Sequence, residues 1–163
     1  MAAIRPCIID ELQAIGAVIN DAARAYQGVV PARFLHEPYM SEDELALEMA
    51  SVRFYGYEEE GSLVAVMGIE PVADVTLLRH AYVLTSRQRR GIGAMLLRHM
   101  ESETRTPWLL LGTWQDSWAV AFYRSHRFEF QPDKDALLAR YWPRVGADQA
   151  ANSVVLGKFV GGK

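Results

Sequence analysis

The chain is poor in cysteine and has no long hydrophobic run. Cys7 is the only cysteine among 163 residues, so neither a disulfide within the chain nor a cysteine-based metal site can form. No apolar run approaches the roughly 18 residues that a membrane-spanning helix needs. The N-terminus also lacks the basic and then apolar pattern of a secretion signal. We therefore expect a protein of the reducing cytoplasm, with no membrane partner and no metal.

An excess of charge of one sign is absent as well. The 17 Lys and Arg residues nearly balance the 20 Asp and Glu residues, and the net charge is −3. No nucleic-acid partner is therefore expected, and an apolar fraction of 50% is ordinary for a globular protein. The length predicts one domain over residues 1–163, which buries about two-thirds of its unfolded surface without help from metals or disulfides.

Hydrophobic periodicity predicts several helices and strands. The expected helices cover residues 10–28 with Asp10 as N-cap, residues 41–49 with a capping box, residues 91–105, residues 117–125 with Asp116 as N-cap, and a short piece before Pro143. The expected strands are residues 52–57, 63–69, 74–84, 108–112, 128–131 and 153–160. Antiparallel strands followed by a strand–helix–strand crossover predict an α/β fold, with a mixed sheet and helices on both faces.

The most informative segment is a basic turn with two glycines, Gln88-Arg89-Arg90-Gly91-Ile92-Gly93, between an expected strand and an expected helix. The first N–H groups of a helix have no partner within it and carry the positive end of its dipole. Gly91 and Gly93 let the main chain approach a ligand without a Cβ in the way. The turn therefore predicts an anion site that suits a phosphate, although a solvated charged turn is the simpler alternative.

Two other nucleotide-binding motifs fail on their spacing. A P-loop needs Gly-Lys-Ser/Thr, and this turn continues as Gly93-Ala94-Met95. The dinucleotide fingerprint needs a third small residue three positions after its second glycine, where this chain has Leu96. A nicotinamide-binding fragment is therefore a poor alternative.

Two motifs in the right order resemble the GNAT acyltransferases. Residues 88–93 fit Gln/Arg-x-x-Gly-x-Gly/Ala, and Ala119-Val-Ala-Phe-Tyr123 fits the Ala-x-x-Phe-Tyr helix that follows the fifth strand. The resemblance covers residues 1–160 and implies a mostly antiparallel sheet of about seven strands, with the fourth and fifth splayed around the cofactor. It implies transfer of an acetyl group from acetyl-CoA to a primary amine of a small molecule, or alternatively of a peptide or protein.

The resemblance also implies which residues contact the cofactor. The turn binds the pyrophosphate through main-chain N–H groups, and the backbone at the end of the fourth strand holds the pantetheine arm and the thioester carbonyl. Asp116 stands where many relatives have an asparagine, so a side-chain donor is lost there. The implied contacts are Ala81, Tyr82, Val83, Leu84, Gln88, Arg89, Arg90, Gly91, Ile92, Gly93, Ala94, Asp116, Ala119 and Phe122.

The implied general acid is Tyr123, which would protonate the leaving thiolate, although a core aromatic is the structural alternative. A lysine-like amine must also lose a proton near neutral pH, at a cost of roughly 4 to 5 kcal/mol. The base candidates are His80, Glu70 and Asp74. His80 shares a strand face with Tyr82 by alternation, but a core histidine and a solvated strand-end carboxylate are the simpler interpretations of His80 and Glu70.

Two departures from the family pattern support an alternative function. Leu77 stands where some histone-acetylating relatives have a carboxylate base, and Arg127 replaces the glycine that usually ends the Ala-x-x-Phe-Tyr helix. A left-handed arginine would cost roughly 1 kcal/mol more than glycine at that position. An acyl-CoA-binding or regulatory module without transfer activity is therefore the second hypothesis.

The resemblance implies that the loop of residues 29–40 forms the acceptor side of the cleft. Phe34, His36 and Tyr39 suggest an aromatic pocket for the amine, or else simple packing anchors. The acceptor, the length of the acyl group and the oligomeric state stay open, with a homodimer favoured only by family habit.

Overall fold

The computed structural model describes residues 1–161 and contains a seven-stranded sheet in the order β1-β2-β3-β4-β5-β7-β6. The strands are β1 (Ala2–Pro6), β2 (Arg53–Glu59), β3 (Ser62–Val72), β4 (Val75–Val83), β5 (Trp108–Trp114), β6 (Glu129–Phe130) and β7 (Ser153–Phe159). The helices are α1 (Leu12–Ala23), α2 (Glu42–Glu48), α3 (Ile92–Glu103), α4 (Ala119–Ser125), α5 (Lys134–Tyr141) and α6 (Ala147–Ala151). None of the helices within residues 1–161 combines the length and apolar character needed to cross a bilayer.

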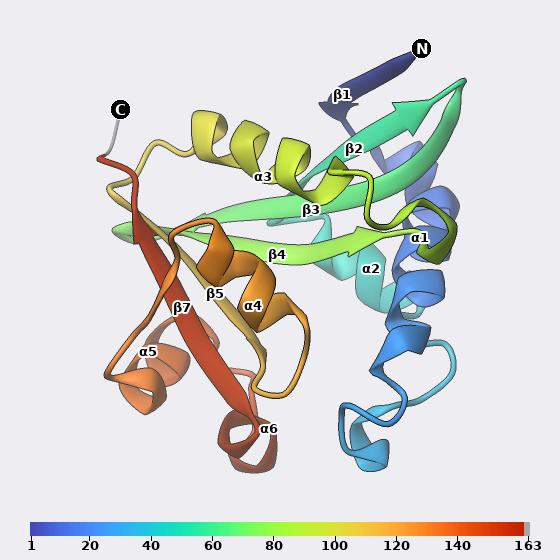
Figure 1. The fold of residues 1–163 in the computed structure, drawn as a ribbon. Helices are drawn as coiled ribbons and strands as arrows, with labels where there is room; N and C mark the ends of the chain where they lie inside the picture. The colour runs from blue at the N-terminus through green and yellow to red at the C-terminus, as the bar shows by residue number, and fades with distance from the viewer. Residues whose placement is uncertain (162–163) are drawn as a thin grey trace.

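The sheet confirms the expected mixed α/β fold and contains a fork. Strands β1 to β4 pair antiparallel, as do β5, β7 and β6, and only β4 and β5 are parallel. That parallel pairing ends at Leu77 and Leu110. Since β4 continues to Val83 and β5 to Trp114, the two strands separate beyond these residues (Figure 1).

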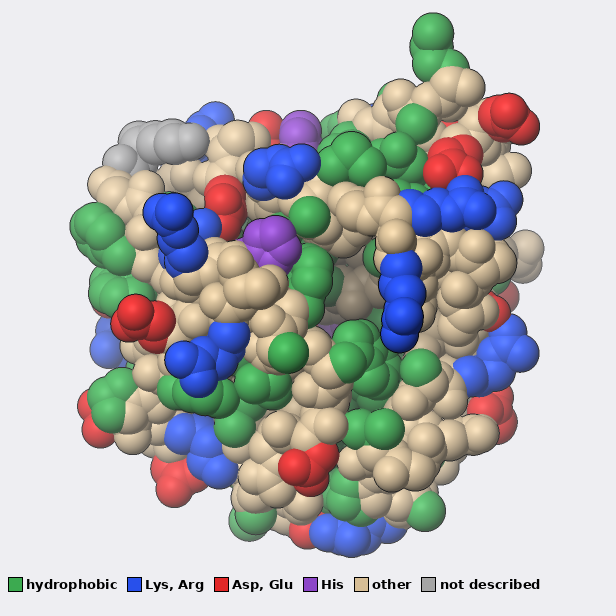
Figure 2. Space-filling view, viewed as in Figure 1, with side chains coloured by type: hydrophobic (Ala, Val, Ile, Leu, Met, Phe, Trp, Pro, Cys, Tyr) green, Lys and Arg blue, Asp and Glu red, His purple; other side chains and the backbone are tan. Residues whose placement is uncertain are grey.

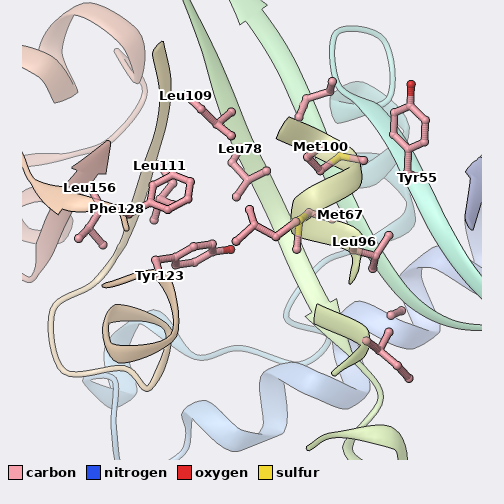
Figure 3. Close-up of a cluster of buried hydrophobic side chains, with 14 of the residues drawn as sticks. Tyr55, Met67, Leu78, Leu96, Met100, Leu109, Leu111, Tyr123, Phe128 and Leu156 are labelled. Atoms are coloured by element: carbon pink, nitrogen blue, oxygen red, sulfur yellow. The ribbon is translucent and has the colours of Figure 1, made fainter. Parts of the chain in front are cut away.

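Helices cover both faces of the sheet. Helices α3 and α4 pack on one face around Leu96, Met100 and Tyr123, and Figure 3 shows this cluster. Helices α1 and α2 cover the other face of β2 and β3, and α5 packs on the same side against β4 and β5. The spacing of Ile92, Leu96 and Met100 is one residue every helical turn, which explains why α3 presents a single apolar stripe to the sheet.

The first expected helix begins differently. Asp10 is not an N-cap, because residues Ile9–Glu11 form a 3-10 turn and α1 starts at Leu12. The Glu11 carboxylate accepts the N–H of Ile8 at 2.9 Å and pairs with Arg5 at 2.5 Å. This local ion pair holds the entry to α1 in place of the expected cap. In contrast, Ser41 caps α2 as expected, since its hydroxyl accepts the N–H of Glu44 at 3.1 Å. The Glu44 carboxylate accepts from that same hydroxyl at 3.1 Å, so only the hydroxyl half of the expected capping box is present within residues 1–161.

Helix α4 begins at Ala119, two residues later than expected, and lacks the expected N-cap. Asp116 is exposed and makes no cap, because the Ser117 hydroxyl accepts the N–H of Ala119, at the start of α4, at 3.3 Å. Helix α6 was not expected at all. Arg127, just past α4, does adopt the left-handed conformation, with φ of 70°, so the chain keeps the backbone turn of the family although it lacks the glycine.

Candidate active site

The basic turn after β4 presents free main-chain donors. Arg89 and Gly91 have φ angles of 63° and 78°, and Gly91 is the N-cap of α3. Within residues 1–161, the N–H groups of residues 88–94 donate to no protein acceptor. Consecutive N–H groups in such a turn form a concave anion site. Arg87 is paired with Glu59 at 3.1 Å, whereas Arg89 and Arg90 are exposed and have no carboxylate partner in that part of the chain.

These residues fit a phosphate-bearing cofactor. The ideal Cβ position of Gly93 lies 3.4 Å from the Phe122 ring, so a side chain there would crowd the contact between α3 and α4. The Leu84 N–H donates to the Val64 carbonyl at 2.9 Å, and by strand alternation the main-chain groups of Val83 face the fork. The Val83 carbonyl accepts from Gln88 Nε2 at 3.1 Å. The N–H groups of residues 88–94, which suit a pyrophosphate, therefore follow the main-chain groups of Val83, which suit an extended pantetheine arm.

Tyr123 lies at the fork on the face of α3 and α4. It shares a cluster with Leu78 and Leu111, the first residues after the pairing of β4 and β5 ends. Figure 3 shows its side chain extending from α4, with Phe128 on one side and the hydroxyl end toward Met67. The hydroxyl has no hydrogen-bond partner within residues 1–161, and burial raises the pKa of Tyr123 well above its ordinary value. The phenol is therefore protonated at neutral pH and has a proton to donate.

His80 lies on the opposite face of the sheet, at a β-bulge. The register of β3 and β4 shifts between Gly68 opposite Arg79 and Val66 opposite Tyr82, and His80 has a φ of 54°. A bulge puts two consecutive side chains on one face, so Arg79 and His80 both point toward α2. The His80 ring stacks on Phe54, with ring centroids 5.7 Å apart. A non-glycine residue in this conformation is uncommon, and such strain clusters at functional sites.

Glu48 of α2 fixes the state of the His80 ring. Its Oε2 lies 2.8 Å from His80 Nε2 and 3.1 Å from the Arg79 guanidinium. The hydrogen bond from His80, together with the charges of Arg79 and Arg144, holds the pKa of Glu48 below its ordinary value. An ionised carboxylate only accepts, so Nε2 carries the proton in the neutral imidazole. The Nδ1 atom then has a free lone pair, and it has no partner within residues 1–161.

Glu70 has a different environment. Its carboxylate accepts from Arg79 at 3.1 Å and is not among the groups that line the cavity next to His80. Arg79 is therefore held between Glu48 and Glu70. Asp74 directly precedes β4. The Tyr141 hydroxyl donates to its carboxylate at 2.7 Å and holds the pKa of Asp74 below its ordinary value. Leu77 is fully buried under Tyr141, so that position belongs to the core.

A cavity of about 470 Å³ opens beside His80, on the same face of the sheet. Tyr82, Trp114 and Leu78 line it, so it reaches the fork from the side opposite to α3. Leu78 belongs to this lining and also to the cluster around Tyr123. Leu78 therefore lies between the cavity and the cluster around Tyr123, where β4 and β5 separate. On the face toward the viewer, Figure 2 shows a central recess bordered by hydrophobic side chains.

The three expected acceptor residues, Phe34, His36 and Tyr39, all line this cavity. Phe34 packs against Trp114 with ring centroids 5.0 Å apart, and Tyr39 against Tyr26 at 5.4 Å. His36 is exposed at the rim, and its Nδ1 donates to the Pro38 carbonyl at 2.7 Å. Phe34 and Tyr39 are therefore both packing anchors and cavity wall, and the two interpretations from sequence do not exclude each other.

Comparison with known proteins places this arrangement among acetyltransferases. A sequence model of the acetyltransferase (GNAT) domain matches residues 50–130. The PaiA N-acetyltransferase from Thermoplasma acidophilum, solved in complex with coenzyme A, has 16% identity over 98% of this chain and 99% of that chain, with a TM-score of 0.74. The ribosomal-protein-S18-alanine N-acetyltransferase from Escherichia coli has 19% identity over 100% and 96%, with a TM-score of 0.73. No curated protein matches the chain by sequence.

The chain belongs to the GNAT acetyltransferase family, whose cofactor is acetyl-CoA. The N-acetylglutamate synthase from Neisseria gonorrhoeae, solved with coenzyme A and N-acetyl-glutamate, is also similar, at 21% identity and a TM-score of 0.73. The alignment covers 98% of this chain and 35% of that longer chain. At these identities the structural likeness shows the fold alone.

Sequence reasoning missed several residues of the site. Glu48 lies 32 residues from His80 on a different element, and nothing in its local pattern distinguishes it from the other acidic residues of α2. Tyr26, Trp114 and Trp142 also line the cavity from three separate segments. Their contribution depends on the tertiary fold, so no motif signals it.

Proposed function

We propose that residues 1–163 form one N-acetyltransferase domain that moves an acetyl group from acetyl-CoA to a primary amine of a small molecule. The observation that carries this proposal is the fork between β4 and β5. The free N–H donors of the turn and the Tyr123 hydroxyl lie on one face of the sheet at this fork. The His80 cavity lies on the other face. A donor and an acceptor entering from opposite faces would meet there. A cytoplasmic location and a homodimer stay expectations.

The cofactor supplies an activated thioester, and the chain's residues bind and orient it. The N–H groups of residues 88–94 bind the pyrophosphate, with Arg89 and Arg90 available for other phosphate oxygens. The main-chain groups of Val83 hold the pantetheine arm, and donors near the thioester carbonyl stabilise the developing oxyanion. Phe122 and Ala119 form the apolar wall of α4 beside this path.

His80 acts as the general base in this proposal. The acceptor nitrogen attacks the thioester carbon, a C–N bond forms, and the C–S bond breaks. His80 Nδ1 takes the proton that the nitrogen loses, because Glu48 holds Nε2 in the protonated form. Glu70 is assigned to Arg79 rather than to the amine, since it accepts from that guanidinium and does not line the cavity. A positioned base of this kind contributes typically 10²- to 10⁴-fold.

Tyr123 acts as the general acid that returns a proton to the leaving sulfur. Its hydroxyl lies at the fork and is protonated at neutral pH, because burial raises its pKa. The same burial disfavours a free thiolate, so the proton passes from the hydroxyl to sulfur as the C–S bond breaks. The Tyr123→Phe variant should lower kcat by roughly 10²-fold while acetyl-CoA binding stays near the wild-type level.

A thermal melt with acetyl-CoA, with coenzyme A and with NADH tests the donor half of the proposal. A ligand at 100 times its Kd adds about 2.7 kcal/mol, which should raise Tm by several degrees for both coenzyme A species and not for NADH. Tyr55→Phe is the matched control for Tyr123→Phe, because Tyr55 is buried in the same cluster and its hydroxyl donates to Glu103 at 3.1 Å. It should lower stability slightly and leave kcat unchanged.

Two results would contradict the proposal. Wild-type turnover in Tyr123→Phe would remove the acid from the mechanism. Binding of acetyl-CoA without any acetylated product, across a broad panel of amines and peptides, would favour the regulatory module instead.

A further inference from the structure

We propose that the acceptor is an amine with an apolar or aromatic body and no carboxylate beside the amine, such as an aralkylamine or an alkyl diamine, rather than an amino acid. This inference rests on the proposed function and specifies its substrate class. Two features of the His80 cavity support it: the aromatic side chains that line the cavity and the ion pairs that its charged side chains already make.

Aromatic rings form most of the apolar wall. The lining includes Tyr26, Phe34, Tyr39, Tyr82, Trp114 and Trp142. Burial raises the pKa of Tyr26 to about 12. Burial also raises the pKa of Tyr82 well above its ordinary value. Both phenols are therefore neutral over the working pH range. Neutral aromatic faces favour apolar bodies and cationic groups and offer nothing specific to a carboxylate.

The arginines that line the cavity are already paired. Arg33 makes a two-pronged pair with Asp148, at 2.5 and 2.7 Å. Arg79 is shared between Glu48 and Glu70, at 3.1 Å each. A carboxylate on the acceptor would have to break one of these pairs or stay without a cation. An unpaired charge in a partly desolvated site is costly.

The remaining charge at the cavity is negative. Glu44 lines it and, within residues 1–161, has no cationic partner, since its carboxylate accepts only from the Ser41 hydroxyl at 3.1 Å. Arg144 does not line the cavity, although its charge acts on Glu48. Glu44 therefore attracts an acceptor that carries a second ammonium group and repels an α-carboxylate.

Matched pairs of acceptors that differ only in the α-carboxylate give a direct test. The wild-type protein is assayed with acetyl-CoA and with phenethylamine against phenylalanine, tryptamine against tryptophan, and cadaverine against lysine. We expect kcat/KM to favour the amine of each pair by about ten-fold or more. Intrinsic reactivity works against this result, because an α-amino group loses its proton at lower pH than an alkylamine.

A variant that frees one arginine sharpens the test. Asp148→Asn removes the partner of Arg33, and both side chains of this pair are 57% exposed, so the fold should tolerate the change. The freed guanidinium should raise the amino acid to amine ratio of kcat/KM several-fold, roughly three to ten. Asp10→Asn is the control, because Asp10 is an exposed carboxylate that does not line the cavity. It should leave the ratio unchanged.

The outcomes separate this inference from the proposed function. Equal or faster acetylation of the amino acids, or faster acetylation of a peptide N-terminus than of any amine, overturns the substrate class and leaves the acetyltransferase intact. An unchanged ratio in Asp148→Asn refutes the argument from the paired arginine. Acetylation of no member of any pair, with acetyl-CoA bound, overturns both proposals.

Discussion

The pair formed by Glu48 and His80 yields the sharpest prediction, because the chain contains its own control. Glu48→Gln and Glu70→Gln each remove one carboxylate from Arg79, both from a distance of 3.1 Å. Only Glu48 also contacts the His80 ring, at 2.8 Å. A difference between the two variants therefore reports the contact with His80 and not the loss of charge beside Arg79.

The size of the effect follows from that hydrogen bond. A hydrogen bond to a charged group is worth about 1.5 to 3 kcal/mol, but both side chains are partly exposed, at 14% and 22%, so solvent screens part of it. A loss of about 1.4 kcal/mol corresponds to a tenfold change in rate.

Glutamine should also disturb the tautomer. The Glu48 carboxylate only accepts, whereas a glutamine amide can donate to Nε2 and shift the proton to Nδ1. His80, the proposed base, would then lack the Nδ1 lone pair in part of the molecules. We expect kcat at neutral pH to fall about ten-fold in Glu48→Gln, with little change in the KM for acetyl-CoA, because the cofactor turn lies on the other face of the sheet.

The assay is kcat and KM for a primary amine at neutral pH, for the wild type and both variants. Glu70→Gln leaves the contact at Nε2 intact and should keep kcat near the wild-type value. An equal kcat in Glu48→Gln and Glu70→Gln would show that His80 is not the base that Glu48 positions.

Two further predictions concern the backbone turns of the cofactor side. Arg127→Gly should stabilise the protein by about 1 kcal/mol and raise Tm by roughly 2 to 4 °C, because Arg127 has a φ of 70°; an unchanged Tm would show that its left-handed conformation carries no strain. Gly91→Ala should cost about 1 kcal/mol, because Gly91 has a φ of 78° with nothing within 4 Å of its ideal Cβ. It should also weaken the Tm shift with acetyl-CoA, and a full shift would indicate that the turn accepts a side chain.

The sequence predicted the turn after β4 and the helix that carries Tyr123, because their signals are local. The turn at residues 88–93 and the helix with Tyr123 depend on glycine conformations, helix termini and short spacings, which a few neighbouring residues determine. The strands of the central sheet followed from alternation in the same way. The helix caps were predicted less well, since Glu11 is engaged by Arg5, and Asp116 makes no cap because Ser117 bonds the first N–H of α4.

The cavity beside His80 was decided by the tertiary structure. Phe34, His36 and Tyr39 could be named from sequence, but the cavity they share with Tyr26, Trp114 and Trp142 comes from segments that meet only in the fold. The bulge at His80 turns this side chain toward α2, where Glu48, 32 residues away, sets its tautomer. Such pairing depends on strand register and helix placement, because side-chain chemistry between distant residues has no local signature. The sequence by itself therefore determined the glycine turn after β4 and the helix that carries Tyr123, and only the tertiary structure brought Glu48, His80 and the aromatic cavity together.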